Sequence, residues 1–216
     1  MKTQENAMKT SQKNSKTTSK MGDRLRVRYL TMTAMLSAIS FILMFFQFSI
    51  PFVPSFVKMD LSELPALIGA FAMGPVYGIL ICLIKNVFHL MVTSTGGVGE
   101  LSNFILGAAF VLPAGILYKI KKTRGMALLG SLVGAVFMAV LSVISNYFIV
   151  YPIYTAFMPM STILHMYQII WPGADTLLKC LIVFNMPFTF IKGILSVIIT
   201  LLVYKHISPI IHGADK

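Results

Sequence analysis

The amino-acid sequence predicts an all-α, polytopic membrane protein: a bundle of six transmembrane helices with both termini in the cytoplasm. Of its 216 residues, 56% are hydrophobic and 12% are charged, whereas soluble domains are ~45–50% apolar and ~25% charged. Several apolar runs approach the ~20 residues that a helix needs to cross the hydrocarbon core of a bilayer. The alternating ten-residue pattern of membrane β-strands does not recur along the sequence.

The distribution of positive charge supports this orientation. Eight of the 18 Lys and Arg residues lie in residues 1–28 and four more in residues 119–124, as is typical of the cytoplasmic ends of membrane helices. We therefore interpret the net charge of +11 as an orientation signal that rests near anionic headgroups of the lipid bilayer, and not as a nucleic-acid-binding surface. The predicted organisation is a disordered basic cytoplasmic tail (1–27), a six-helix membrane domain (28–205) and a short cytoplasmic C-terminal tail (206–216).

Proline and glycine divide the apolar sequence into six predicted helices. Pro51 and Pro54 end the first, because proline cannot continue the helical hydrogen-bond ladder. The second begins at a cap formed by Asp60 or Ser62 and is short, so we expect it to be tilted or to lie where the bilayer is thin. The expected helices span residues 29–50, 62–74, 76–92, 100–118, 126–150 and 177–204, with outer loops at 93–99 and from 151 to the sixth helix.

Small residues four positions apart allow two membrane helices to approach closely. Gly130 and Gly134 form one such pair on the fifth predicted helix, and Ala34 and Ala38 form another on the first. The helix that approaches Ala34 and Ala38 belongs either to this chain or to a partner, and spacing alone leaves both possibilities open.

Four consecutive predicted helices carry polar side chains in their outer halves or near the middle. Such groups are costly at membrane depth and usually mark a cavity or binding site, and spacings of three, four or seven residues put the members of each set on one helix face. We therefore expect an inward-facing pocket for a polar, flat, uncharged small molecule. The candidate lining residues are Lys85, Asn86 and His89; Glu100 and Asn103; Ser142 and Asn146; and Asn185, Thr189 and Lys192.

Several of these residues also have an ordinary structural interpretation. In this interpretation Glu100 complements the positive end of its helix, and Lys192 pairs with a carboxylate or reaches the membrane interface. Asn146 would then join two helices by a hydrogen bond, and His89 would be a packed, hydrogen-bonded histidine. Aromatic residues near the outer ends either sandwich a planar ring or form an interfacial belt: Phe45, Phe46, Phe48, Tyr147, Phe148, Tyr151, Tyr154, Trp171, Phe184 and Phe188.

The motifs of several enzyme classes are missing from the sequence. It contains no phosphate-cradling G-x-x-x-x-G-K-[ST] loop, no H-E-x-x-H and no G-x-S-x-G, and its two cysteines, Cys82 and Cys180, form no C-x-x-C pattern. We therefore predict that the chain is not an enzyme and that it has neither a metal site nor a cofactor.

Three segments resemble a known family: DLSELPALIGAFAMGPVYG (60–78), IKNVFHLMVTSTGGVGELSNFILG (84–107) and NMPFTFIKG (185–193). They are similar to the riboflavin-specific substrate-capture subunit, the S component, of energy-coupling factor (ECF) transporters, and the likeness covers residues 29–205. It implies a six-helix protein of a prokaryotic plasma membrane that binds riboflavin from outside with high affinity. It also implies a transmembrane coupling subunit and two cytoplasmic ATPases as partners, whose ATP hydrolysis topples the S component and carries the vitamin inward.

The resemblance also implies roles for individual residues. The family's alanine-x-x-x-alanine motif, which docks onto the coupling subunit, matches Ala34 and Ala38. Thr189 stands where the family pattern has asparagine. The implied riboflavin-binding residues are Gly99, Glu100 and Asn103 from the GEL-x-NF segment, Asn146 and Lys192 from the fifth and sixth helices, and, more weakly matched, Asn86, Tyr147, Asn185 and Thr189.

The sequence leaves other functions open. The same fold can bind another flavin or an unrelated vitamin. An autonomous secondary transporter or channel would use Lys85, Glu100 or Lys192 as ion-coupling groups, and an intramembrane enzyme is disfavoured by the shortage of clustered acids, histidines and cysteines.

Overall fold

The computed structural model describes residues 25–50, 53–54 and 57–212. Most of the predicted N-terminal tail, and the last four residues of the predicted C-terminal tail, lie outside these ranges. Within them the first helix begins at Leu25 and the last helix, α9 (Met186–His212), continues past residue 205. Both helices therefore extend into stretches that the sequence assigned to tails.

The described chain is almost entirely helical, which confirms the predicted class. Five helical stretches are long and apolar enough to cross a membrane: Leu25–Phe45, Pro75–Val92, Val98–Ile120, Arg124–Tyr154 and Leu177–Val203. A sixth apolar helix, α2 (Glu63–Met73), has 11 residues and is short, as expected. Six complete crossings and the cytoplasmic placement of both termini remain predictions.

The long stretches are assembled from shorter elements. Helix α3 (Pro75–His89) continues as a 3₁₀ turn, η1 (Leu90–Val92), and α4 spans Val98–Ile120. Helix α5 (Arg124–Ser145) passes through a π-helical segment, η2 (Asn146–Val150), into α6 (Tyr151–Tyr154). Helix α8 (Leu177–Cys180) passes through a second π-helical segment, η3 (Leu181–Asn185), into α9. The two π-helical segments thus interrupt the fifth and sixth predicted helices.

One predicted helix end and one predicted loop were wrong. The first helix ends at Phe45 rather than at residue 50, because the chain becomes extended and pairs β1 (Phe48–Ser49) with β2 (Lys58–Met59) in an antiparallel ribbon. The segment after residue 151, predicted to be a long loop, contains α7 (Met160–Ile170). Pro159 precedes this helix, and its buried residues Ile163 and Tyr167 are four positions apart, so that they share one face.

Close packing of α4 against α5 forms the centre of the bundle, with α3 on one side and α9 on the other. A Cβ atom added at Gly134 would lie 2.4 Å from the Phe110 carbonyl oxygen, and one at Gly130 would lie 3.0 Å from the Ala114 carbonyl oxygen. The predicted small-residue pair therefore does bring two backbones together. Ala34 and Ala38, in contrast, are exposed on the first helix.

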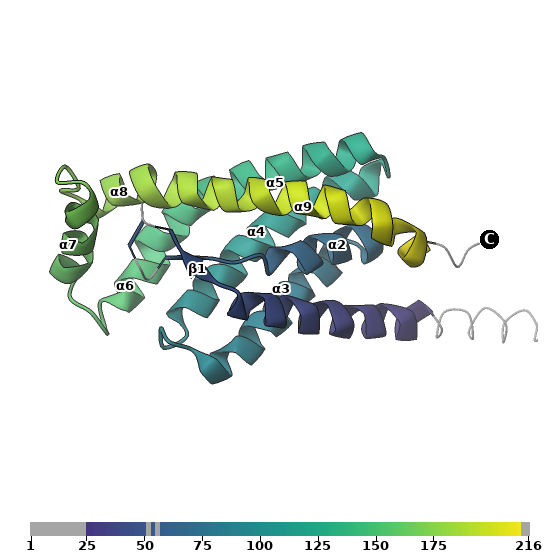
Figure 1. Ribbon diagram of the computed structural model, residues 1–216, viewed down its shortest axis with the longest axis horizontal. Coiled ribbons are helices and arrows are strands. Elements are labelled where there is room, and N and C mark those ends of the chain that lie inside the picture. Colours follow the sequence, from purple (N-terminus) through teal and green to yellow (C-terminus); the bar gives the residue numbers. More distant parts are fainter. Residues whose placement is uncertain (1–24, 51–52, 55–56, 213–216) are drawn as a thin grey trace, which may run out of the picture.

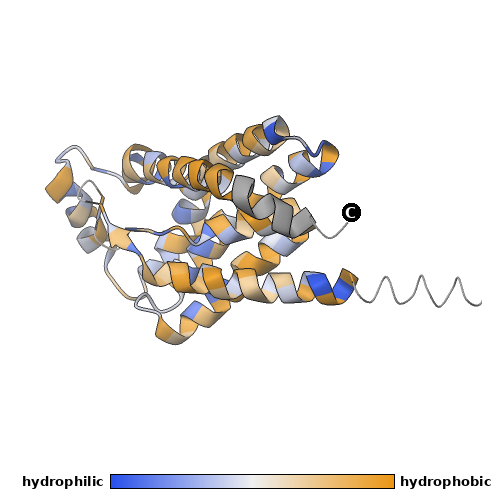
Figure 2. Ribbon diagram, turned by 45° about the vertical axis from the view of Figure 1, so that its right-hand side comes forward, coloured by the Kyte–Doolittle hydropathy of each residue, from blue (hydrophilic) through white to orange (hydrophobic). Residues whose placement is uncertain are grey.

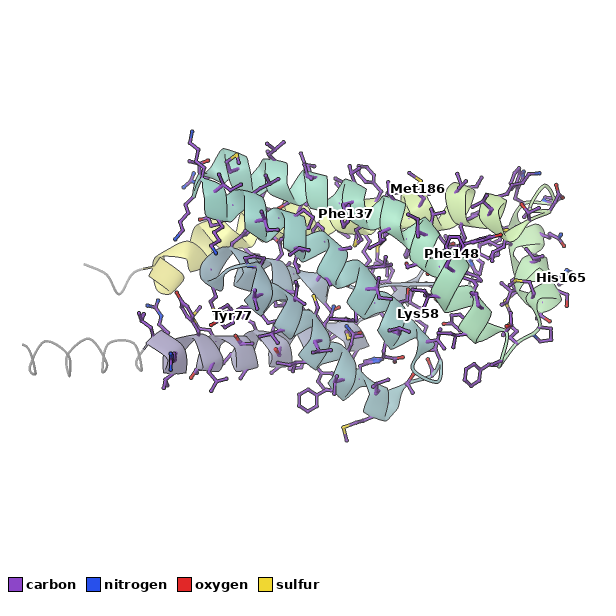
Figure 3. All side chains as sticks on the ribbon, turned by 180° about the vertical axis from the view of Figure 1, so that it is seen from behind. Lys58, Tyr77, Phe137, Phe148, His165 and Met186 are labelled. Atoms are coloured by element: carbon purple, nitrogen blue, oxygen red, sulfur yellow. The ribbon has the colours of Figure 1, made fainter. Side chains whose placement is uncertain are left out.

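The two ends of the bundle differ in chemistry. The start of the first helix and the end of α9 lie at one end, and α6, α7 and α8 lie at the other (Figure 1). Hydrophilic residues gather at the first end, at the start of the first helix and in the turn between α4 and α5 (Figure 2). The sides are apolar: Phe137 of α5 and Phe148 of η2 are exposed on the outer surface (Figure 3).

Candidate functional site

A cavity of about 290 Å³ lies in the half of the bundle that holds the end of the first helix and the start of α4. Its polar lining comes from β2, α2, α3, α4, η2, α6, η3 and α9, while Met44, Leu106, Met138, Val150 and Phe188 supply apolar wall. Seven of the nine residues predicted to bind the ligand line it: Gly99, Glu100, Asn103, Asn146, Asn185, Thr189 and Lys192.

The other two predicted ligand-binding residues do not line the cavity. Asn86 is buried in α3, where its Nδ2 donates a hydrogen bond to the Cys82 carbonyl oxygen at 2.7 Å. Tyr147 of η2 is 41% exposed, and its ring packs edge-on against Phe148 with centroids 5.0 Å apart. Their placement does not support contact with a ligand in this cavity.

Lys192 lies in a buried network of charges at the base of the cavity. Its Nζ is 3.0 Å from an Asp60 carboxylate oxygen and 3.2 Å from a Glu63 oxygen. Glu63 also pairs with Lys85 at 3.3 Å, and Lys85 donates to Ser62 as well. Two cations thus face two anions, and the expectation that Lys192 pairs with a carboxylate is confirmed.

Asp60 is held in this network by several hydrogen bonds. The backbone N–H and the hydroxyl of Ser62 both donate to its Oδ1, and Asn103 Nδ2 lies 3.5 Å from its Oδ2. Burial raises the pKa of the Asp60 carboxyl, but the Lys192 and Lys85 cations and the Ser62 hydrogen bonds outweigh it and hold the pKa well below its ordinary value. Asp60 is therefore a carboxylate at neutral pH.

Glu100, in the first turn of α4, organises the loop at the rim of the cavity. One of its carboxylate oxygens lies 2.7 Å from His89 Nδ1, and the other accepts hydrogen bonds from the Thr93 and Thr95 hydroxyls at 2.9 and 3.2 Å. Thr95 Oγ1 in turn accepts from the Gly99 N–H at 3.0 Å. Both Glu100 oxygens have protein partners, and His89 is a hydrogen-bonded residue that also lines the cavity.

Amide side chains of the two π-helical segments also line the cavity. Asn146 opens η2 and accepts a hydrogen bond from the Ser102 hydroxyl at 3.4 Å. Asn185 closes η3, and its side chain contacts the hydroxyls of Tyr151 and Tyr167. π-Helical turns are rare and are frequently found at functional sites. Here they place two amides, Asn146 and Asn185, in the lining of one cavity.

The ten aromatic residues separate into two groups and Phe184, which is partly buried and packs against apolar clusters. Tyr151, Tyr154 and Phe188 line the cavity and are available to a planar ring. The larger group is exposed, as in an interfacial belt: Phe45, Phe46, Phe48, Tyr147, Phe148 and Trp171.

The sequence prediction missed several lining residues. Asp60 had been interpreted only as a possible helix cap, and Glu63, Lys58 and Thr95 had not been predicted to line a cavity. The two acidic residues, Asp60 and Glu63, gave only a weak signal, because acidic residues are common at helix starts. Nothing in their sequence spacing relates them to Lys192. Together the cavity offers apolar wall, amides, hydroxyls and a balanced set of buried charges, a lining suited to an uncharged molecule with both apolar and hydrogen-bonding edges.

Comparison with known proteins relates this arrangement to a family. The family described as "ECF transporter, substrate-specific component" matches residues 28–204. Riboflavin transporter RibU of Staphylococcus aureus (strain TCH60) is 33% identical over 175 residues, 81% of this chain and 87% of that protein. Riboflavin transporter FmnP of Bacillus subtilis (strain 168) is 34% identical over 190 residues, 86% of this chain and 94% of that protein.

The fold has a solved counterpart. A structure described as "Structure and mechanism of the S component of a bacterial ECF transporter" superposes with a TM-score of 0.70 at 32% identity, and the match covers 87% of this chain and 99% of the other. The chain belongs to the family of substrate-specific components of ECF transporters.

Proposed function

We propose that this protein binds riboflavin in the cavity between α2, α4, α5 and α9, and that it is the substrate-capturing subunit of an ECF-type importer. The observation that carries the proposal is the convergence of seven predicted binding residues, from α4, η2, η3 and α9, on one cavity. The family match and the two relatives named as riboflavin transporters support it.

The lining suits the chemistry of riboflavin. The flavin ring has an apolar dimethylbenzene edge, which fits beside apolar side chains such as Leu106 and Phe188, and a uracil-like edge of donors and acceptors. Asparagine has both donor and acceptor groups, so Asn146 is suited to that edge, and Asn185 can offer it a donor. The ribityl hydroxyls both donate and accept, and the Asp60–Lys192 pair offers them charge-assisted hydrogen bonds.

ATP-driven transport by this protein would require partners, because its sequence has no phosphate-cradling nucleotide loop. We expect a transmembrane coupling subunit and two cytoplasmic ATPases to supply the energy. The exposed Ala34 and Ala38 allow another helix to approach the first helix, so we assign the docking surface to them. We infer six crossings of a prokaryotic plasma membrane with both termini in the cytoplasm. The hydrophilic residues at the start of the first helix and in the turn between α4 and α5 (Figure 2) support this orientation.

A riboflavin titration of the detergent-purified protein tests the proposal. We expect quenching of flavin fluorescence that saturates near one ligand per chain, and yellow protein when the host contains riboflavin. Colourless protein that does not quench flavin fluorescence would contradict the choice of ligand. Uptake into liposomes without ATPase partners would instead indicate an autonomous secondary transporter.

A further inference from the structure

Three buried side chains beside the cavity form a closed ring of hydrogen bonds. The Tyr167 hydroxyl of α7 donates to Asn185 Oδ1 of η3 at 2.7 Å, and Asn185 Nδ2 donates to the Tyr151 hydroxyl of α6 at 3.3 Å. The two tyrosine hydroxyls are 2.5 Å apart. All three residues are at most 5% exposed, so water does not compete freely for these contacts.

The hydrogen bonds give the ring a direction. The amide oxygen of Asn185 faces the Tyr167 hydroxyl at 2.7 Å, a usual O–H···O distance, and the amide nitrogen faces the Tyr151 hydroxyl at 3.3 Å. Because the single hydroxyl proton of Tyr167 goes to Asn185, Tyr151 donates its own proton to the Tyr167 oxygen. Each member donates once and accepts once within the ring, an arrangement in which the bonds strengthen one another.

Only part of this ring faces the cavity. Tyr151 and Asn185 line it, and Tyr167 is not among its lining residues. Tyr167 packs in a buried apolar cluster with Ile163 and Cys180. The centroid of its aromatic ring lies 5.4 Å from that of Phe184. The hydrogen bonds of the Tyr167 hydroxyl to Asn185 and Tyr151 therefore connect it to the cavity lining.

We propose that Tyr167 is a positioning residue for the riboflavin site and that it fixes the orientation of the Asn185 amide. This inference rests on the proposed function. The ring uses the amide oxygen and one N–H of Asn185, so the second N–H is the donor that this side chain offers to a ligand. The ligand atom at this position is then an acceptor, such as a carbonyl oxygen of the uracil-like edge. If the amide were rotated by 180°, its oxygen would face the acceptor atom of the ligand, and two acceptors cannot form a hydrogen bond.

A competing role is purely structural: Tyr167 would only anchor α7 to the bundle. The two roles differ in how mutations combine. If the hydroxyl acts through the Asn185 amide, its removal has no further effect once that amide is gone. If it only anchors α7, its removal weakens binding by the same factor whether or not the Asn185 amide is present.

The test is a double-mutant cycle on riboflavin affinity, measured by flavin fluorescence quenching. We expect Tyr167→Phe to weaken binding about tenfold, as is typical for loss of one buried hydrogen bond. In an Asn185→Leu background the same change should weaken binding by less than about twofold. Tyr77→Phe is the control, because Tyr77 packs against Tyr29 of the first helix, away from the cavity, and should bind like the wild type.

Unchanged affinity in Tyr167→Phe, or the same loss in both backgrounds, would overturn the proposal. If Asn185→Leu binds too weakly to measure, Asn185→Ala, which removes the amide without adding bulk beside the cavity, replaces it in the cycle. The proposal again predicts less than about twofold further loss on adding Tyr167→Phe, and the same loss as in the wild-type background would overturn it. A wild-type protein that does not bind riboflavin would refute the proposed function itself and, with it, this inference.

Discussion

Replacing Lys192 with methionine tests the charge network at the base of the cavity. Methionine keeps much of the length of the side chain but removes the cation that lies 3.0 Å from Asp60 and 3.2 Å from Glu63. Lys85 remains beside Glu63, so Asp60 becomes the buried carboxylate without a close cation. Removing one partner of a buried ion pair costs about 3–5 kcal/mol, and for a chain of this size that lowers the unfolding midpoint by roughly 10 °C.

The pH dependence of this loss of stability provides a second, independent test of the charge network. In the wild type the pKa of Asp60 lies below its ordinary value, so its stabilising contribution is present at neutral pH and is lost only in strong acid. Without Lys192 we expect burial to outweigh the remaining Lys85 cation and Ser62 hydrogen bonds and to raise that pKa above the unfolded value, so that the charged form becomes destabilising as the pH rises. The deficit of the variant should therefore be largest near pH 7 and shrink toward pH 4.

Thermal unfolding of the purified protein between pH 4 and pH 8 measures both effects. Lys58→Met is the matched control, because Lys58 is an exposed lysine at the same cavity and its loss should change the midpoint little. Asp60→Asn combined with Lys192→Met should recover part of the stability, because it removes the unpaired charge. A Lys192→Met protein with a wild-type midpoint, or with a deficit that does not change with pH, would refute this interpretation of the network.

Three further predictions concern binding and transport. Ala34→Leu or Ala38→Leu should abolish riboflavin uptake in cells that contain the ATPase partners and leave the Kd of the purified protein unchanged; normal uptake would place the docking surface elsewhere. Glu100→Gln should weaken riboflavin binding about tenfold, because a neutral amide is a weaker acceptor for the His89 and rim-loop hydrogen bonds; a wild-type Kd would separate that loop from binding. Asn146→Ala should weaken binding about three- to tenfold, and an unchanged Kd would remove that amide from the site.

The fold was largely predictable because membrane helices are long and uniformly apolar. Each of the five long stretches was recognised, and the close approach of α5 to α4 at Gly130 and Gly134 was indicated by small-residue spacing. The missed helix α7 has only 11 residues and lies between Pro159 and Pro172, a context that is typical of a loop. Its amphipathic spacing of Ile163 and Tyr167 was a signal that the neighbouring prolines obscured.

The site was predictable only in part, for a different physical reason. Polar residues spaced along one helix share a face, and this rule found the Asn185–Thr189–Lys192 stripe that lines the cavity. It cannot say which residues of other helices meet that stripe. Asp60 is 132 positions from Lys192 in the chain, and only the folded bundle brings them together. The same limit led to Asn86 being included, since its polarity was visible and its direction was not.

The position of the flavin in a structure of the riboflavin complex provides the most direct test of the proposed binding site. We expect the flavin ring in the cavity between α4, η2 and α9, with polar atoms within hydrogen-bond distance of Asn146 and of the Asp60–Lys192 pair. A riboflavin molecule found outside this cavity, or a cavity that stays closed to riboflavin at saturating concentration, would contradict it.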